Sequence, residues 1–302
     1  MSVLRLATRR SPLALIQAEF VRDHLGAHGI KSELVHIDTS GDSQTDVPLS
    51  TLGGQGVFAL EIQRAVLQGE ADVAIHSAKD LPSVTPSGLV IASVPERRDA
   101  ADVLVGRSLA GLGPGATVAT GSPRRRALLL ERRPDLRVVE LRGNMATRLA
   151  RAGKDGVDAV VTAAAALDRL GESDLVAERL DTDWFVPQVG QGALALETRD
   201  DDAETMATLA KITDADAMEA VTAERAFLAE LGAGCSIPAG AYATLANGII
   251  SLLGVMLAAD GSRSVRGSVS GRDPAMLGRQ LAVQLRDREG GSALPGWDVG
   301  GV

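Results

Sequence analysis

The sequence predicts an α/β protein with two α/β domains followed by a smaller α+β domain. Short strand-like segments alternate with helix-like segments from residue 3 to about residue 95, and the same alternation restarts after Pro95. From about residue 215 the pattern changes to one long helix, three alternating strands and a final helix. Repeated strand and helix alternation is typical of a mostly parallel sheet covered by helices, which predicts two such units before the C-terminal domain.

The first unit opens with a short apolar strand and an apolar-periodic helix. Pro12 suits the first helical position because its fixed backbone angle matches a helix, and Ser11 before it is a favourable N-cap residue. A loop containing Gly53, Gly54 and Gly56 lies in the middle of the unit. The predicted elements are strand 3–8, helix 12–24, strand 32–38, helix 58–67 and strand 72–76.

In the second unit, two strand-to-helix junctions place arginines beside helix N-termini, where backbone N–H groups bind anions readily. The junctions are residues 120–123 and 142–144. The predicted elements of this unit are strands near Val103 and Thr117, helix 123–132, strand 136–141, a helix from Asn144 and strand 158–162. The third domain is predicted to contain helix 215–231, strands 239–245, 249–258 and 265–269, and helix 274–286. We expect the glycine-rich tail 290–302 to be loose because it lacks periodicity.

Composition argues against several classes of protein. The net charge is -8 and aromatic residues make up 2% of the chain, whereas nucleic-acid binding needs a basic surface and stacking aromatics. The longest apolar stretches, such as residues 159–167, are far shorter than the roughly 20 residues that span a bilayer, so we expect a cytoplasmic protein without a membrane partner. A single cysteine excludes an internal disulfide, and the four histidines show no metal-ligand spacing with it, so we expect no metal site.

Arginine dominates the basic residues, because lysine occurs only at Lys31, Lys79, Lys154 and Lys211. The arginines gather at strand-to-helix junctions, at Arg9, Arg10, Arg124, Arg125, Arg126, Arg142 and Arg148. Cations in the first turn of a helix oppose the helix dipole, and arginine is suited to bidentate recognition of carboxylates. We interpret the clusters as a site for a polycarboxylate. A codon bias towards arginine and ordinary solvated residues are the alternatives.

Two short segments carry residues suited to chemistry. The segment from His76 to Pro82 follows a strand, and its Asp80 could transfer protons or stabilise a cation while Lys79 helps to keep it ionised. An ordinary polar turn is the alternative. Cys235 follows Gly234, and glycine leaves the thiol open to reaction. A small buried hydrophobe is the alternative there, because no base partner for the thiol is visible.

Six motifs occur in a fixed order along the chain: residues 7–14, 76–82, 120–125, 141–149, 190–194, and the loop of Cys235. In this sequence they read ATRRSPLA, HSAKDLP, TGSPRR, LRGNMATRL, GQGAL and LGAGCSIP. Together they resemble the motifs of the porphobilinogen deaminase family. The resemblance is strong from residue 3 to residue 240 and rests on length and pattern beyond that.

The resemblance implies a hydroxymethylbilane synthase, a transferase that deaminates porphobilinogen and joins four molecules head to tail into a linear tetrapyrrole. Cys235 would hold a dipyrromethane cofactor through a thioether. Asp80 would be catalytic, assisting loss of ammonia and stabilising the cationic azafulvene. The cofactor would also be bound by Lys79, Asp80, Thr120, Ser122, Arg124, Arg125, Arg142 and Gly143. The substrate would be bound by Arg9, Ser11, Phe58, Arg148, Arg169 and Gln191.

The resemblance also implies the architecture: two periplasmic-binding-protein-like α/β domains around a cleft, and a small α+β C-terminal domain that carries the cofactor. Domain 1 would comprise residues 1–95 and 190–212, domain 2 residues 96–189, and the third domain residues 213–302, in a chain expected to be a monomer. The glycine-rich loop departs from the family, since Thr51, Gln55 and Leu60 stand where many members have lysine. A carboxylate-binding role of that loop is therefore in doubt, although Phe58 matches the family's loop aromatic.

Two other interpretations remain open at this stage. A non-enzymatic solute-binding protein would bind anions in the same kind of cleft, and it would need neither Cys235 nor Asp80. An inactive paralogue would keep the fold without turnover, which the altered glycine-rich loop makes conceivable. Release of ammonia from porphobilinogen distinguishes both from an active enzyme.

Overall fold

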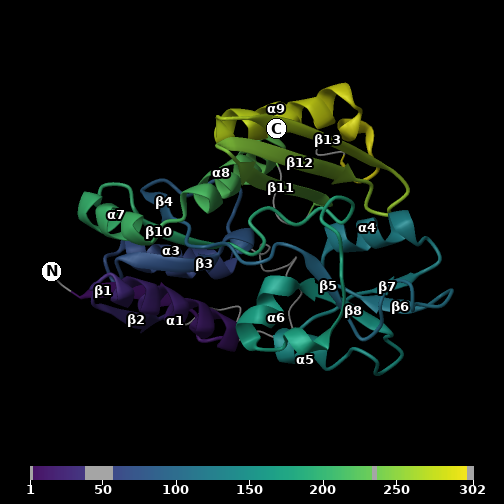
Figure 1. Cartoon of the computed structure of the whole chain (residues 1–302), viewed down its shortest axis with the longest axis horizontal. Helices are drawn as coiled ribbons and strands as arrows, with labels where there is room; N and C mark the ends of the chain where they lie inside the picture. The colour runs from purple at the N-terminus through teal and green to yellow at the C-terminus, as the bar shows by residue number, and fades with distance from the viewer. Residues whose placement is uncertain (1–2, 38–56, 233–236, 298–302) are drawn as a thin grey trace.

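The computed structural model describes residues 3–37, 57–232 and 237–297, and at residues 57 and 58 only the course of the backbone. These parts of the chain form three sheets, two with five strands and one with three (Figure 1). The two larger sheets lie in separate lobes, and the three-stranded sheet lies above them in this view. Within the described ranges, no helix has the length and apolar character needed to cross a membrane.

The first lobe contains strands β1 (Leu4–Thr8), β2 (Ser32–His36), β3 (Val73–Ser77), β4 (Leu89–Ser93) and β10 (Leu194–Arg199), and helices α1 (Pro12–Ala27), α3 (Val57–Leu67) and α7 (Ala203–Leu209). The strand order is β2-β1-β3-β10-β4, with β1 parallel to β2 and β3, and β10 antiparallel to both neighbours. Successive strand side chains point to opposite faces, so Leu6 packs with α1 and Ala7 packs with α3.

The second lobe contains strands β5 (Asp102–Val105), β6 (Thr117–Ala119), β7 (Arg137–Val139), β8 (Ala159–Ala163) and β9 (Val176–Arg179), and helices α4 (Pro123–Arg132), α5 (Met145–Leu149) and α6 (Ala164–Leu170). Its order, β7-β6-β8-β5-β9, repeats the arrangement of the first sheet, with β5 antiparallel to both neighbours. Leu128 of α4 packs on one face with Leu104, whereas Leu167 of α6 packs on the other with Val103.

The third lobe contains helix α8 (Ala215–Glu230), an antiparallel sheet of β11 (Ala239–Ala246), β12 (Ile249–Leu257) and β13 (Ser264–Gly271), and helix α9 (Pro274–Val283). A π-helical turn, Gln284–Arg288, continues α9. Helix α8 begins at Asp214, whose side chain accepts a hydrogen bond from the backbone N–H of Ala217. Phe227 of α8 and Leu281 of α9 are fully buried in the core of this lobe.

The prediction of two α/β units and an α+β domain is confirmed, but the larger sheets are mixed rather than mostly parallel. In each, two of the four strand pairings are antiparallel. In the first sheet the antiparallel pairings come from a strand that is distant in sequence. Strand β10 follows the second lobe along the chain but inserts between β3 and β4. Strands β4, β9 and β10 and helices α6 and α7 were not predicted.

The third lobe packs against both of the others. Ala217 and Val221, in the first half of α8, are buried with Ala78 and Leu81 of the first lobe. On the other side, Val255 and other residues of β12 join the core of the second lobe, where they pack with α4. Helix α8 therefore supports the loop that follows β3, where sequence analysis placed Asp80.

A buried carboxylate fixes α8 to the two chain segments that cross between the lobes. Glu224 is fully buried and accepts hydrogen bonds from Arg97 Nη1 at 2.7 Å and Nη2 at 3.2 Å. It also accepts from the backbone N–H groups of Gly190, at 2.7 Å, and Ala243, at 2.8 Å. Arg97 lies in the first crossing segment and Gly190 in the second, so one side chain connects both segments with the third lobe.

The prediction of a loose tail is wrong for residues 290–297. Leu294 and Trp297 are buried in the core of the third lobe. The indole N–H of Trp297 donates a hydrogen bond of 2.7 Å to the backbone oxygen of Leu257. Two large side chains in a short segment are enough to order it without any periodic pattern, because a buried aromatic contributes a large apolar area.

We predict that Glu224→Gln lowers the free energy of unfolding by about 3–5 kcal/mol, because it leaves Arg97, whose side chain is 11% exposed, without a counter-charge. The measurement is urea denaturation. Glu230→Gln on the same helix is the control, since Glu230 is partly exposed and lies 3.4 Å from Arg286, and should change stability by less than about 1 kcal/mol. Equal effects of the two substitutions would contradict the role assigned to Glu224.

Candidate functional site

The candidate catalytic carboxylate lies directly after β3, in a single 3-10 turn, η1 (Ala78–Asp80). Ala78 and Leu81 are buried on either side of Lys79 and Asp80 and anchor the turn. Gly190 lies against it so closely that a Cβ atom there would approach the Ala78 backbone to 2.9 Å. Asp80 itself is exposed, and no hydrogen bond or ion pair joins its carboxylate to another residue of the described ranges.

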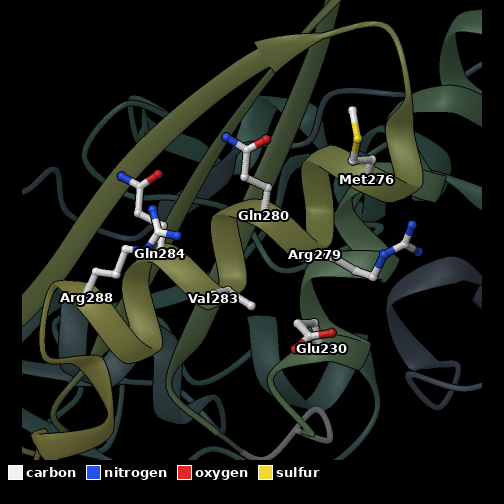
Figure 2. Close-up of a pocket in the computed structure, with 7 residues that line it drawn as sticks. All are labelled: Glu230, Met276, Arg279, Gln280, Val283, Gln284 and Arg288. Atoms are coloured by element: carbon white, nitrogen blue, oxygen red, sulfur yellow. The ribbon is translucent and has the colours of Figure 1, made fainter.

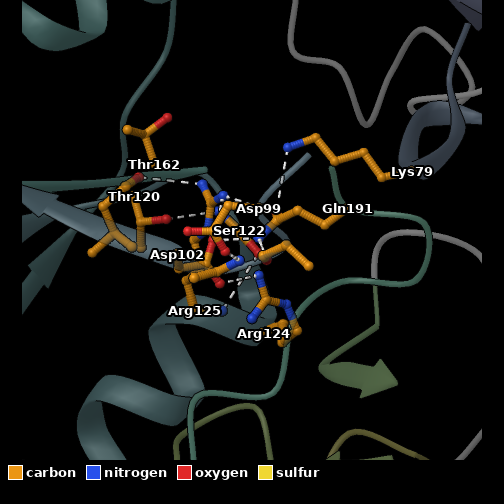
Figure 3. A network of polar contacts seen from close by, with 12 residues as sticks. Lys79, Asp99, Asp102, Thr120, Ser122, Arg124, Arg125, Thr162 and Gln191 are labelled. Atoms are coloured by element: carbon orange, nitrogen blue, oxygen red, sulfur yellow. Dashed lines mark hydrogen bonds and ion pairs between the residues drawn. The ribbon is translucent and has the colours of Figure 1, made fainter. Parts of the chain in front are cut away.

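A buried network lies next to this turn, centred on Asp102 at the start of β5 (Figure 3). Asp102 is fully buried and accepts a hydrogen bond of 2.8 Å from Arg124 Nη2 and one of 2.9 Å from Arg125 Nε. Both arginines occupy the first turn of α4, whose N-cap is Ser122. The carboxylate of Asp102 therefore balances part of the positive charge of the two arginines at the N-terminus of α4.

Gln191 connects the network to the turn that carries Asp80. Its amide nitrogen donates to Asp102 at 3.0 Å and to the backbone oxygen of Ala100 at 2.7 Å. Its amide oxygen accepts from Lys79 Nζ at 3.4 Å and from Arg125 Nη2 at 3.3 Å. Gln191 is fully buried. Because it bonds to Lys79 of the first lobe and to Arg125 of the second, it lies between the two lobes and orients a cation from each.

The cations of this region repel one another and are partly withdrawn from water. Burial, and then repulsion from Arg125, lower the pKa of Lys79 to about 8, although Asp80 and Asp102 oppose the shift. Burial and Arg125 likewise lower the pKa of Arg148, against the attraction of Asp80. Burial acts to raise the pKa of Asp102, but its two arginines outweigh that effect and keep the pKa below its ordinary value. The region therefore holds more positive than negative charge.

The segment that follows β7 presents two further arginines. Arg142 is exposed and donates from Nε and Nη2 to the same oxygen of Glu140, at 2.9 and 2.8 Å. Arg148, on α5, donates from Nε to the backbone oxygen of Gly143 at 2.7 Å. Gly143 has a φ of 99°, which L side chains rarely adopt, and Asn144 caps α5. The predicted junction is thus a turn in which Arg148 is bonded to the backbone and Arg142 to the side chain of Glu140.

The remaining predicted residues lie in three places. Ser11 and Ser122 act as N-caps and accept backbone hydrogen bonds of 3.4 Å, and Thr120 Oγ1 accepts from the backbone N–H of Ser122 at 3.2 Å. Arg169, at the end of α6, donates to the backbone oxygen of Gly192 at 2.9 Å, and burial followed by repulsion from Arg98 lowers its pKa to about 10. Arg9 is half-buried in the short connection between β1 and α1.

Several predicted residues cannot be placed in this way. Cys235, Thr51 and Gln55 lie outside the described residues, and Phe58 is described only as part of α3. Leu60, two residues further along α3, is 42% exposed. The sequence departures in the glycine-rich loop therefore stay without a structural account.

Two observations fit a bound polycarboxylate such as dipyrromethane. First, Arg124 Nε is buried and has no hydrogen-bond partner in the described parts of the chain, although Nη1 donates to the backbone oxygen of Val186 at 2.7 Å. Second, Lys79, Arg125 and Arg148 together exceed the negative charge around them. A small cavity beside Arg124 is lined by Ser122, Arg124, Gln188, Val189, Leu228, Ile237 and Ala239. One of these lining residues, Ile237, is two residues from Cys235 in sequence.

A larger hollow, of about 410 Å³, lies elsewhere, on the surface of the third lobe between the end of α8 and α9 (Figure 2). It is lined by Glu230, Met276, Arg279, Gln280, Val283, Gln284 and Arg288. None of these residues was predicted as part of the site. Within the described residues, no group of three or more His, Cys, Asp or Glu side chains is placed to hold a metal ion.

Sequence analysis missed Asp102, Arg97 and Glu224. Asp102 opens an apolar strand, and Glu224 stands among the buried positions of α8, so each is a charged residue at a core position. Charged residues are almost never fully buried unless they are paired. That pattern could have identified both as members of buried ion pairs, although not their partners.

The chain is similar to proteins of one family throughout its length. The family model described as "Porphobilinogen deaminase, dipyromethane cofactor binding domain" matches residues 4–207, and "Porphobilinogen deaminase, C-terminal domain" matches residues 218–287. A porphobilinogen deaminase of Trichlorobacter lovleyi is 44% identical over 297 residues, covering 96% of this chain and 95% of the relative. One of a Roseiflexus species is 46% identical over 300 residues, covering 97% and 99%.

Among solved structures, the chain is similar to a periplasmic substrate-binding protein of an ABC transporter from Coxiella burnetii. The TM-score is 0.44 and the sequence identity 15%, and the match covers 74% of this chain and 97% of that one.

We predict that Asp102→Asn lowers the free energy of unfolding by about 3–5 kcal/mol, because two buried arginines lose their shared counter-charge. Asp99→Asn is the matched control. Asp99 lies three residues earlier and pairs with Arg179 at 2.6 Å, but both side chains are more than a third exposed, so its loss should cost less than about 1 kcal/mol. Chemical denaturation of the two variants provides the comparison, and a mild Asp102→Asn would show that the network is not structural.

Proposed function

Because the chain belongs to the porphobilinogen deaminase family, we propose that Asp80 and the surrounding cations carry out that family's reaction in this protein. The enzyme is a hydroxymethylbilane synthase, which joins four porphobilinogen molecules head to tail and releases ammonia, in tetrapyrrole biosynthesis. The observation that carries the assignment of residues is the exposed carboxylate of Asp80, which lies among cations of both lobes without pairing with a described side chain.

The dipyrromethane cofactor, when bound, supplies the pyrrole to which the first substrate is joined. We infer that Cys235 holds it covalently, and that Lys79, Arg124, Arg125, Arg142 and Arg148 pair with acetate and propionate groups of the cofactor and of the substrate units joined to it. The unpartnered Nε of Arg124 supports this inference, because a buried donor is costly without an acceptor. Thr120 and Gly143 would help to shape the same surface.

Asp80 would act on each substrate before and after ammonia leaves. Its carboxylate can accept hydrogen bonds from the protonated aminomethyl group of the substrate, since no described residue donates a hydrogen bond to it. When ammonia departs, the substrate becomes a cation, and the same negative charge stabilises it electrostatically. Because the turn of Asp80 is anchored by Ala78, Leu81 and Gly190, the carboxylate needs little reorganisation for either role.

Substrate carboxylates would be bound by Arg9, Arg148 and Arg169, with neutral donors beside them. Ser11 uses an oxygen lone pair to cap α1, which leaves its hydroxyl hydrogen available to donate to a carboxylate. Gln191 is fully buried, so we assign it the orientation of Lys79 and Arg125 rather than direct contact. The part of Phe58 in substrate binding stays a prediction.

We infer the domain division 1–95 with 190–212, 96–189 and 213–302, which the membership of β10 in the first sheet supports. That the enzyme is a cytoplasmic monomer with no nucleic-acid or membrane partner stays a prediction from sequence. An inactive paralogue is the alternative that an assay of ammonia release from porphobilinogen tests directly.

We predict that Asp80→Asn yields folded protein that retains the cofactor but turns over at least about a hundredfold more slowly, because the amide keeps the size and loses the charge. Asp80→Glu should retain more activity than Asn, since its charge survives in a displaced position. Ammonia release measures turnover, and intact mass reports the cofactor, which Cys235→Ser should lack. Parent-like turnover of Asp80→Asn would show that the catalytic carboxylate lies elsewhere, with Asp42 and Asp46 the first candidates.

We also predict that the KM for porphobilinogen rises as the pH passes about 8, because Lys79 then loses the proton that lets it attract a carboxylate. The pKa of Lys79 is lowered, so its charge is present below pH 8 and lost above it. Lys79→Gln should raise KM by about tenfold or more at neutral pH and remove this part of the pH profile, as expected for loss of one charge-assisted hydrogen bond. Lys79→Arg should keep the charge at higher pH. If the KM of Lys79→Gln rises with pH in the same way as that of the parent, the titrating group is not Lys79.

A further inference from the structure

The ion pair of Glu140 and Arg142 differs from the buried pairs, because it is exposed and neither side chain has a further hydrogen bond or ion pair within the described parts of the chain. Arg142 Nε and Nη2 both donate to one oxygen of Glu140, and this is the only partner of either side chain among the described residues. The side chains are 52% and 65% exposed for Arg142 and Glu140, respectively. The pair therefore contributes little to stability and can open without disturbing the fold.

We propose that Glu140 is an internal competitor, which pairs with the guanidinium of Arg142 when no carboxylate of the cofactor, the substrate or the growing chain does. This proposal rests on the proposed function of Arg142. Glu140 stands two residues before Arg142, on the same turn after β7, so the competitor is always within reach. A carboxylate of the ligand and the carboxylate of Glu140 are chemically alike. Binding at Arg142 is thus an exchange of one carboxylate for another.

The other arginines of the site are held differently. Arg124 and Arg125 share the buried Asp102, which no ligand can displace without breaking the network. Arg148 donates to a backbone oxygen, that of Gly143, which carries no full charge. Arg142 alone, among these four arginines, has an exposed carboxylate as its partner.

Exchange suits a reaction that adds four carboxylate-bearing units in succession. Each addition must move carboxylates of the growing chain past fixed arginines, and an arginine that holds one too tightly would delay the next step. When a chain carboxylate leaves Arg142, Glu140 can take its place, so the guanidinium is not left without a counter-charge. Glu140 thereby limits how tightly Arg142 retains any one unit.

The test is a double-mutant cycle with Glu140→Gln and Arg142→Leu, measuring KM and kcat of ammonia release at fixed ionic strength. Glu140→Gln removes the competing charge and should lower KM about two- to fivefold without raising kcat, the range expected for an exposed ion pair. In the Arg142→Leu background the same substitution should have no effect on KM. The control is Asp135→Asn, which removes the charge of Asp135 from a partly exposed pair of the same spacing, Arg133 with Asp135, that lies outside the site; it should leave KM unchanged.

The outcomes separate this inference from the proposed function. A KM for Glu140→Gln equal to or above that of the parent overturns the inference, since a residue that positions Arg142 for binding would raise KM on removal. A decrease in KM that persists without Arg142 also overturns it. If Arg142→Leu itself leaves KM and cofactor content unchanged, the role of Arg142 fails together with the inference. If Arg142→Leu raises KM while Glu140→Gln leaves KM unchanged, only the inference fails.

Discussion

The shared carboxylate of Asp102 is the constraint on which the arrangement of the site depends. Two guanidinium groups in the first turn of one helix would repel each other and oppose the helix dipole, yet both are buried here. Asp102 makes this possible by accepting from both, and Gln191 extends the arrangement to Lys79 of the other lobe. A single buried negative charge thus fixes the positions of cations that would otherwise move apart.

A second buried carboxylate, Glu224, places the third lobe in the same framework. It binds one residue from each crossing segment, Arg97 and Gly190, and Gly190 in turn lies against the turn that carries Asp80. A movement of the lobes that displaces Arg97 or Gly190 from Glu224 would break these hydrogen bonds. The hydrogen bonds of Glu224 therefore couple the third lobe to the position of the turn that carries Asp80.

Some local structure could be predicted from the sequence, above all the starts of helices, although α6 and α7 were missed. Ser11 caps the helix that begins at Pro12, as predicted, and the second helix begins at Pro123, as predicted, because a helix start depends only on residues within one turn. Asp102, by contrast, pairs with residues more than 20 positions away, and β10 pairs with β3 across more than 100. Such contacts leave no periodic signal. The burial of Trp297 escaped prediction for the same reason, and motif resemblance rather than pattern identified the site.

The site combines cations whose partners are fixed with one whose partner can exchange, and this combination follows from burial. A buried pair such as Asp102 with Arg124 is costly to separate, because each ion would remain unpaired in a medium of low dielectric constant. An exposed pair such as Glu140 with Arg142 separates readily, because water solvates both ions. Fixed cations can define where carboxylates bind, whereas an exchangeable cation can release them. An enzyme that retains its cofactor while its product grows needs both properties, and the depth of each arginine in the protein determines which one it has.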